Sequence, residues 1–227
     1  MMAVQKKQKA AMKVEPPKLE AQQSLANSEE VEFFDEAEYS RLKIAGAVFA
    51  GVSAQFVILD KCLLESARFN GASLKKLRLA DCKFATCDLS NLDLSKCTVN
   101  RNELLDSKLT GVLARNAYFA NVRFEKCIID NAQFLESDFK KVIFNECKLT
   151  GTDFQHCDLQ EAKFENCDLS GCNFDEAKLS GCDFRGSDLK SVKVRPQDLK
   201  GAIINRDQAL ALGHYFASLL GIEVLDI

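Results

Sequence analysis

The chain has 227 residues, with 30 Lys or Arg against 33 Asp or Glu, so its formal net charge at neutral pH is −3. This length suits about one domain beside a leader, and the balance excludes a strongly basic or strongly acidic protein. The charges are nevertheless uneven. Residues 42–150 carry sixteen basic and twelve acidic side chains, whereas residues 151–192 carry four and nine. One half is therefore mildly basic and the other acidic.

Residues 1–32 are predicted to be a disordered tail. The segment is rich in Lys, Gln and Glu, contains Pro16-Pro17, and offers almost nothing to bury, a composition typical of chains that do not fold alone. It has no apolar run long enough for a secretory signal or a membrane anchor. The alternative is a basic docking peptide formed by Lys6, Lys7, Lys9 and Lys13.

Residues 33–204 show a five-residue period. It is clearest from Phe144 to Leu189, where Phe or Leu stands at every fifth position and a small residue stands two positions before it. The other three positions are mostly polar. A helix repeats near 3.6 residues and a flat strand at 2, so neither fits. An extended step followed by a corner every five residues predicts a solenoid of stacked coils.

Every twentieth residue falls in one column of this pattern. In the later coils two columns hold Phe: Phe124, Phe144, Phe164 and Phe184, and opposite them Phe134, Phe154 and Phe174. From Leu149 to Leu189, Leu occupies the columns between them. This alternation favours four sides per coil, with successive coils about 4.8 Å apart.

These repeats resemble the pentapeptide-repeat family, whose motif is roughly A(D/N)LXX with Leu or Phe at its centre. Segments such as CDLSGCNFDEAKLSGCDFRGSDL carry the resemblance, which covers about residues 34–204. Cys replaces the commoner Ala at many small positions. The resemblance implies an all-β fold, a right-handed quadrilateral β-helix of about eight coils, closed by a short C-terminal helix.

Several positions depart from the regular pattern. Phe34 and Tyr39 lie on the five-residue period, so the segment around them is expected to begin the first coil or to plug its open end. Ala54 and Ala114 stand where a large residue belongs, which predicts either local bulges or thin patches of core. Asn102 places a polar side chain at a small inward position.

The ten cysteines all fall on the small inward position of the repeat. We therefore expect buried free thiols that act as small apolar side chains, rather than disulfides or a metal site. Reduced cysteines fit a cytoplasmic compartment. The residues concerned are Cys62, Cys82, Cys87, Cys97, Cys127, Cys147, Cys157, Cys167, Cys172 and Cys182.

Two kinds of outward side chain are candidates for binding a partner. Leu113 and Leu135 fall on one side in adjacent coils, with Tyr118 just past the next corner, and a contiguous apolar patch there would form a contact site. Ordinary surface scatter is the alternative.

The second kind is acidic. Asp138 is expected to stack on Asp158, and Asp168 on Asp188. Like charges on adjacent rungs repel, so these columns either lean on neighbouring Lys residues or serve a partner.

Residues 205–227 are predicted to form a helix followed by a short strand, which caps the solenoid or joins two copies. Asn205 and Gln208 form a capping-box pattern, and Gly221 is a natural helix stop. The apolar stripe of this helix consists of Leu212, Phe216, Leu219 and Leu220. Similar endings in some family members join two rods end to end, so the resemblance favours a homodimer over a monomeric cap.

No catalytic arrangement, phosphate loop or metal-ligand spacing is present in the sequence, so we expect neither an enzyme nor a bound cofactor or metal. The function expected is a non-catalytic interaction scaffold with a protein partner. The alternative comes from the resemblance, because some family members protect DNA gyrase by mimicking DNA. Direct binding to nucleic acid or to a membrane is not expected.

Overall fold

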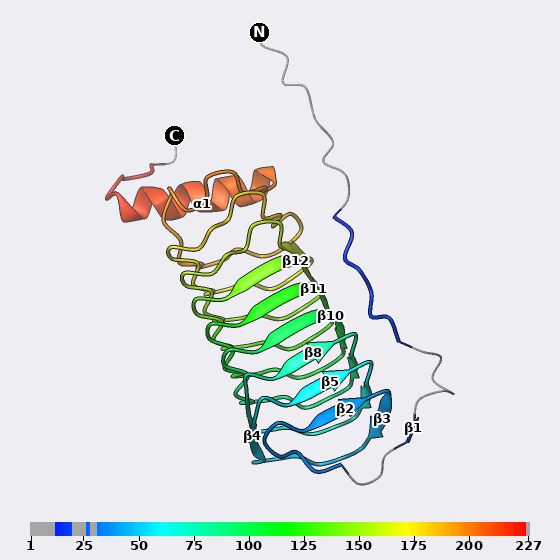
Figure 1. Ribbon diagram of the computed structural model, residues 1–227. Coiled ribbons are helices and arrows are strands. Elements are labelled where there is room, and N and C mark those ends of the chain that lie inside the picture. Colours follow the sequence, from blue (N-terminus) through cyan, green and yellow to red (C-terminus); the bar gives the residue numbers. More distant parts are fainter. Residues whose placement is uncertain (1–11, 20–25, 28–30, 226–227) are drawn as a thin grey trace.

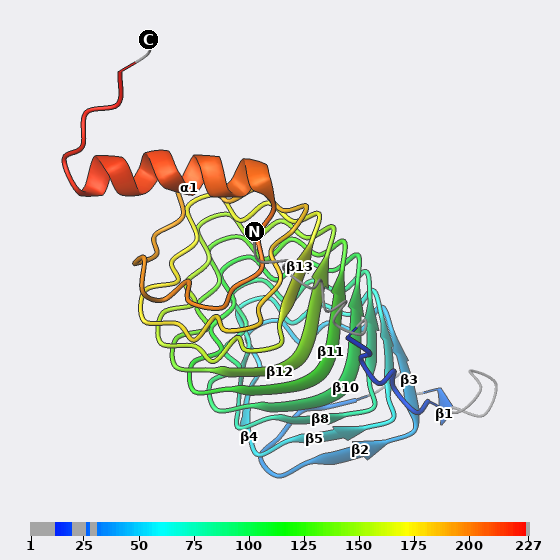
Figure 2. The ribbon, with the colours of Figure 1, turned by 90° about the horizontal axis from the view of Figure 1, so that it is seen from above.

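A computed structural model describes residues 12–19, 26–27 and 31–225 of the chain. The repeats form a four-sided solenoid of parallel strands, and helix α1 (Arg206–Leu219) lies across its C-terminal end (Figures 1 and 2). Residues 20 positions apart pair with one another, as in Val99↔Phe119 and Phe119↔Phe139. The all-β solenoid with a C-terminal helix is therefore confirmed.

Four ladders define the four sides of the rod, which we number in chain order. The first side contains β2 (Glu38–Ser40), β5 (Ile58–Asp60), β8 (Arg78–Ala80) and the opening halves of β10 (Thr98–Leu105), β11 (Tyr118–Glu125) and β12 (Asp138–Asn145). The second side contains β1 (Ala26–Asn27), β3 (Leu42–Ala45), β6 (Leu63–Glu65), β9 (Lys83–Ala85), the closing halves of β10 to β12, and β13 (Lys163–Glu165).

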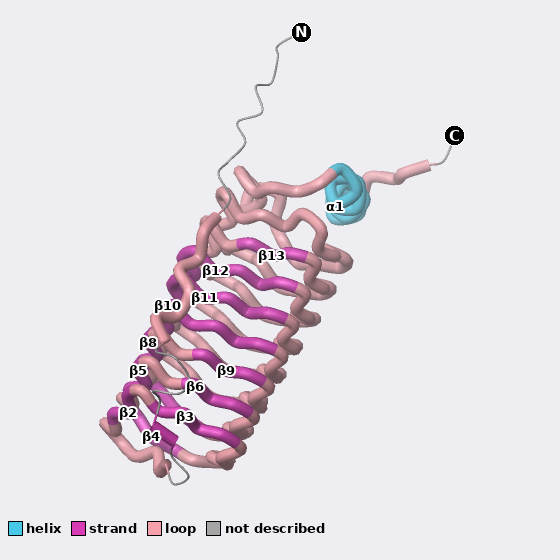
Figure 3. Tube along the Cα trace, turned by 90° about the vertical axis from the view of Figure 1, so that its right-hand side faces the viewer, coloured by secondary structure: helices cyan, strands magenta, loops and turns pink. Residues whose placement is uncertain are grey.

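The other two sides are held mainly by isolated bridges. On the third side these run from Val48↔Arg68 to Asp168↔Asp188. The fourth side has β4 (Ser53–Gln55) and β7 (Ser73–Lys75), followed by bridges as far as Asn173↔Lys193. Figure 3 shows the resulting ladder of short strands along the rod.

The number of coils with regular strands is slightly smaller than expected. On the first side, six successive levels carry strands, namely β2, β5, β8, β10, β11 and β12. The bridges Asp138↔Asp158 and Asp158↔Lys178 then continue the ladder. About six turns are thus regular β-solenoid, and the later ones hold the same register through single-residue bridges.

The core consists of stacked side chains on the inside of the coils. Phe144 and Phe164 stack with ring centroids 4.9 Å apart, and Phe154 and Phe174 stack at 5.3 Å. The corners bring the chain round with residues in the left-handed region, such as Gly151 at φ 68°. Glycine adopts that conformation without the strain that a Cβ brings.

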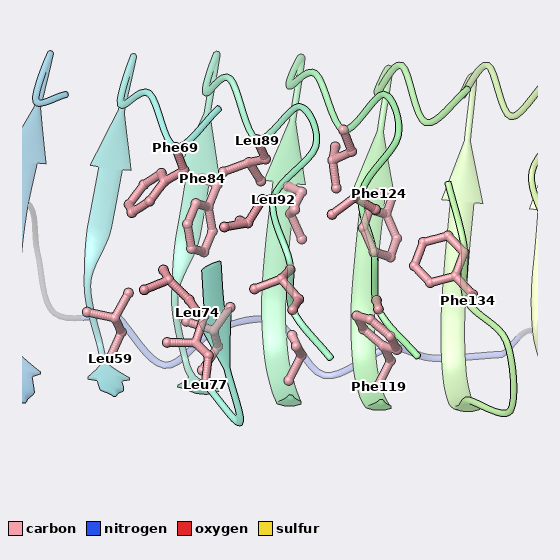
Figure 4. Close-up of a pocket in the computed structure, with 17 residues that line it drawn as sticks. Leu59, Phe69, Leu74, Leu77, Phe84, Leu89, Leu92, Phe119, Phe124 and Phe134 are labelled. Carbon is pink, nitrogen blue, oxygen red and sulfur yellow. The ribbon is translucent and has the colours of Figure 1, made fainter. Parts of the chain in front are cut away.

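Neither Ala54 nor Ala114 marks a bulge. Ala54 pairs with Leu74 in unbroken register, and the bridges on both sides of Leu113 keep the 20-residue spacing. Ala114 instead borders an apolar cavity of about 40 Å³ in the core, shared with residues such as Leu94 and Phe134 (Figure 4). The short Ala side chain leaves the core thin at this level.

The first coil is plugged by Phe33 rather than by Phe34. The ring of Phe33 is buried and contacts Phe49 at 4.6 Å, edge to face, whereas Phe34 is 63% exposed. The segment therefore plugs the open end as expected, but it does so through Phe33 and not through Phe34, which lies on the five-residue period. Within the described residues no coil precedes this turn to hold its register, so the chain places the neighbouring aromatic ring in the core.

Residues 12–19, which we call the arm, lie lengthwise against the rod at the edge between the first and second sides (Figure 1). The prediction for residues 1–32 was a disordered tail. Within that range, the structure describes the arm and β1, which pairs with β3. In this position Met12, Val14, Pro17 and Leu19 are all half-buried, so the docked arm contributes apolar side chains to the contact.

Candidate interaction surfaces

The cysteines offer no accessible nucleophile. All ten are free and buried, and burial raises the pKa of Cys87 to about 11 and that of Cys97 to about 12. A buried neutral thiol is a poor nucleophile and a poor metal ligand. Among the described residues, no group of three or more His, Cys, Asp and Glu side chains could hold a metal ion.

The structure brings Asp138 and Asp158 together as one rung of the first side. The next rung is Lys178, whose Nζ lies 3.4 Å from Asp158 Oδ2. Asp158 Oδ1 also accepts the N–H of Gln160 at 3.1 Å. Both carboxylate oxygens of Asp158 therefore have partners within the protein, one in its own turn and one on the neighbouring coil.

Asp168 and Asp188 form the corresponding rung of the third side. Each accepts an N–H from the residue two positions later, Ser170 at 2.9 Å and Lys190 at 2.9 Å. Hydrogen bonds from the Ser170 side chain and N–H hold the pKa of Asp168 below its usual range. Asp168 therefore stays ionised at neutral pH, and Asp188 is exposed.

The apolar candidates lie among polar neighbours. Leu113 sits on the fourth side between Asp93 and Gln133, and Leu135 is two residues beyond Gln133. Tyr118 is on the first side, where the Lys140 ammonium lies 5.8 Å from its ring centroid. All three side chains are half-buried, so each offers a small apolar area bounded by polar groups.

Helix α1 closes the C-terminal end of the solenoid. Its capping box forms as the sequence predicts, with Asn205 and Gln208 exchanging hydrogen bonds at 2.8 and 2.9 Å. Gln208 Nε2 also donates to the carbonyl oxygens of Phe184 and Ser187, at 2.6 and 2.7 Å. Leu212 is 4% exposed against the end of the core. These two side chains form the cap.

Only the end of the apolar stripe leaves the core uncovered. Phe216 is half-buried and packs against the core, whereas Leu219 and Leu220 are 59% and 72% exposed. The final turns of α1 extend past the outline of the coils (Figure 2). Exposed apolar residues continue through Ile222, Val224 and Leu225.

The short strand expected after α1 is not formed over residues 222–225, and residues 226–227 lie outside the described part. Within the described residues, no helix is long and apolar enough to cross a membrane.

Two polar features were not predicted from the sequence, although the inward position of Asn102 was. The first is a set of buried side chains at the small inward position that each accept an N–H from the coil before: Asn102, Ser107, Ser137 and Ser187. The second is the ion pair of Asp81 with Arg101, which anchors the arm. Opposite charges 20 residues apart are the signal that would have found that pair.

A family model described as a pentapeptide repeat region matches residues 77–145 and 137–211 of the chain. The chain belongs to the pentapeptide-repeat family. This membership confirms the resemblance seen in the repeats. The matching family describes a repeat region and not a catalytic domain.

Solved structures of other pentapeptide-repeat proteins are similar to this chain. HetL, involved in heterocyst differentiation regulation in the cyanobacterium Nostoc sp., is 16% identical with a TM-score of 0.38, over 76% of this chain and 91% of its own. Trypsin-treated QnrB1, a plasmid-mediated fluoroquinolone resistance protein, is 19% identical with a TM-score of 0.40, over 82% and 99%. Likeness at this level says nothing about this chain's partner. No curated protein matches its sequence.

Proposed function

We propose that this pentapeptide-repeat protein is a non-catalytic scaffold that binds a protein partner through the outer faces of its rod. The observation that carries the proposal is the division between inside and outside. Every thiol is buried, whereas the outward side chains stand on rungs of fixed register. Such a rod presents outward side chains at set positions, and its ten thiols are not available as nucleophiles.

The charges on the rod favour a protein partner over nucleic acid. Within the described residues, six of the eleven lysines in residues 42–150 are paired with carboxylates, for example Lys75 with Asp93 at 3.4 Å and Lys148 with Asp130 at 3.0 Å. A surface that binds the phosphate backbone of a nucleic acid needs clustered Lys or Arg side chains that are not already paired, because they must displace the counterions of the phosphates. We also propose a cytoplasmic location, in which ten unpaired thiols would stay reduced.

The second candidate is a DNA mimic that binds DNA gyrase, as some family members do. The stacked carboxylates of Asp168 and Asp188 favour it, since residues 151–192 carry nine acidic and four basic side chains. A dimer formed end to end through Leu219 and Leu220 would bring two such acidic segments together at its centre. The pairing of Asp158 with Lys178 weakens the case, because it neutralises one of the acidic columns.

Site-specific photocrosslinking tests the scaffold. A photoreactive amino acid replaces Tyr118, Leu113 or Leu135 in turn, and in a control variant it replaces the exposed corner residue His156. The proposal predicts that one protein is crosslinked from some of these positions and not from others. Equal labelling from every position would contradict a defined binding face.

A gyrase supercoiling assay tests the second candidate. Increasing protein is added with and without a quinolone. Inhibition or protection that weakens in the Asp168→Lys, Asp188→Lys variant would support mimicry. An unchanged reaction at large excess would exclude gyrase and leave the scaffold proposal intact.

A further inference from the structure

One strip of the rod is covered where the other faces are open. Outward apolar residues on the third side are exposed, 55% at Val48 and 45% at Ile128. On the first and second sides, the outward residues Ala120 and Ile143 are only 7% and 4% exposed. A side chain that points away from the core is buried by the side chains of neighbouring rungs or by a segment that lies over it. Beside this edge of the rod lies the arm, residues 12–19 (Figure 1).

The arm is anchored by its backbone at two points. The N–H of Lys18 donates to Asp81 Oδ1 at 2.9 Å, and the N–H of Glu15 donates to Asn121 Oδ1 at 3.4 Å. Asp81 is itself held by Arg101, whose Nε and Nη2 donate to its two carboxylate oxygens at 2.7 and 2.6 Å. The first acceptor is therefore fixed in place before the arm docks.

The spacing of these anchors matches an extended chain. Lys18 and Glu15 are three residues apart, a span of about 10 Å when fully extended. Asp81 and Asn121 are two coils apart, which is about 9.6 Å at the strand spacing of β-structure. A peptide that runs along the rod axis thus presents one N–H to each acceptor, whatever its side chains are.

The side chains of the arm alternate in two short runs, before and after the exposed pair Glu15-Pro16. Met12, Val14, Pro17 and Leu19 are half-buried, whereas Lys13, Glu15, Pro16 and Lys18 are exposed. The strip also continues beyond the arm. Next to Met12 and Lys13 lies a groove of about 510 Å³, bounded on the rod by residues that include Lys141, Lys163 and Arg185.

We propose that this strip is a binding surface for extended peptides with apolar side chains at alternate positions, and that the arm is its intramolecular occupant. The occupant is held by two backbone donors and half-buried side chains, so it can be displaced without unfolding the rod. The arm then acts as a strap that closes the strip until a peptide of the same chemistry replaces it. This inference does not depend on the scaffold proposal.

The test uses the full chain and changes only the arm. The variant Val14→Asp, Lys18→Pro, Leu19→Asp removes two apolar contacts and one donor while leaving the strip intact. The probe is a fluorescein-labelled peptide with the sequence of residues 12–19, and its anisotropy reports binding. We expect it to bind this variant at least about tenfold more tightly than the native protein, whose own arm competes at high effective concentration. Circular dichroism confirms that the rod is unchanged.

A change on the rod identifies the site. Adding Asp81→Asn to the arm variant is expected to weaken peptide binding by about tenfold, as removal of a charged acceptor implies. Asp93→Asn, on the fourth side and paired with Lys75, is the matched control and should change nothing. Absence of binding to the arm variant, equal binding to the native chain, or equal effects of the two Asn substitutions would each overturn the proposal.

Discussion

Asn102 lies one coil after Cys82, and its Oδ1 accepts the Cys82 N–H at 2.9 Å inside the rod. Its Nδ2 donates to the carbonyl oxygens of Leu79 and Asn100, at 3.1 and 2.9 Å. The side chain is fully buried, yet all its hydrogen-bonding groups are satisfied. Asn102, which departs from the repeat by placing a polar side chain at a small inward position, thus links successive coils through hydrogen bonds.

The substitution Asn102→Ala should destabilise the protein by about 2–3 kcal/mol, because it leaves the buried N–H of Cys82 without an acceptor. Asn102→Ser should restore part of the loss, because Ser137 plays this role for Ala117 at 2.9 Å. Chemical denaturation measures both. Equal stabilities of the Ala and Ser variants would contradict this role of the side chain.

Filling the cavity beside Ala114 should raise the stability of the protein. Ala114→Leu adds three buried carbons next to Leu94 and Phe134 and should stabilise the protein by about 1–2 kcal/mol. Ala162→Leu is the control, because Ala162 is buried but does not line the cavity, and overpacking there should cost about 1–3 kcal/mol. Thermal melts that move in the same direction for both variants would argue against a thin core at this level.

Release of the arm should depend on the protonation of Asp81. Hydrogen bonding from Arg101, followed by the N–H of Lys18, holds the pKa of Asp81 below its usual range. A carboxylate whose pKa is lowered in the folded state stabilises that state at neutral pH. This contribution is lost as the pH falls through the lowered pKa. The Lys18 amide should therefore stay protected from hydrogen exchange between pH 7 and about pH 5 and lose protection at lower pH. Loss of protection already above pH 5 would contradict the anchor.

The buried thiols should be inert in the native state. At pH 8 we expect a thiol reagent such as DTNB to modify the native protein at least about a hundredfold more slowly than the unfolded chain, because burial favours the neutral thiol. In denaturant all ten cysteines should react. Rapid reaction of several thiols without denaturant would show that the solenoid opens locally.

The C-terminal stripe should separate into two roles. Leu212→Ala should lower the stability of the protein by about 2–5 kcal/mol, because that side chain is buried against the core. Leu219→Glu with Leu220→Glu should leave the melting temperature unchanged and reduce self-association, since both side chains are exposed. Sedimentation velocity measures the association. A native protein that is monomeric at all concentrations would exclude the homodimer.

Much of the fold can be predicted from the sequence because one strong period governs it. A Phe or Leu at every fifth position leaves little choice of which side chain faces inward, as the stacking of Phe144 on Phe164 shows. The five-residue period does not predict the inward residue correctly in the first coil, which has a neighbouring coil on one side only. Phe33 replaces Phe34 in the core there, and the arm docks although its composition resembles that of a solvated tail.

The candidate surfaces were harder to predict, because outward residues carry no periodic signal. Asp158 and Asp168 occupy equivalent positions of the repeat. Asp158 nevertheless pairs with Lys178 on the neighbouring coil, whereas Asp168 accepts hydrogen bonds from Thr150 and Ser170. Such partners come from neighbouring coils and turns. They lie 20, 18 and 2 positions away in the three cases, so no single spacing in the sequence reveals them.

Affinity capture with three surface variants tests the central claim most directly. The native protein is compared with Asp138→Lys, Asp158→Lys; with Asp168→Lys, Asp188→Lys; and with Leu113→Glu, Leu135→Glu, all of which change outward residues only. If the rod is a scaffold with a defined binding face, one partner should bind the native protein and be lost from one variant while the other two retain it. A partner retained equally by all three variants, or enzymatic turnover by the purified protein, would contradict the account.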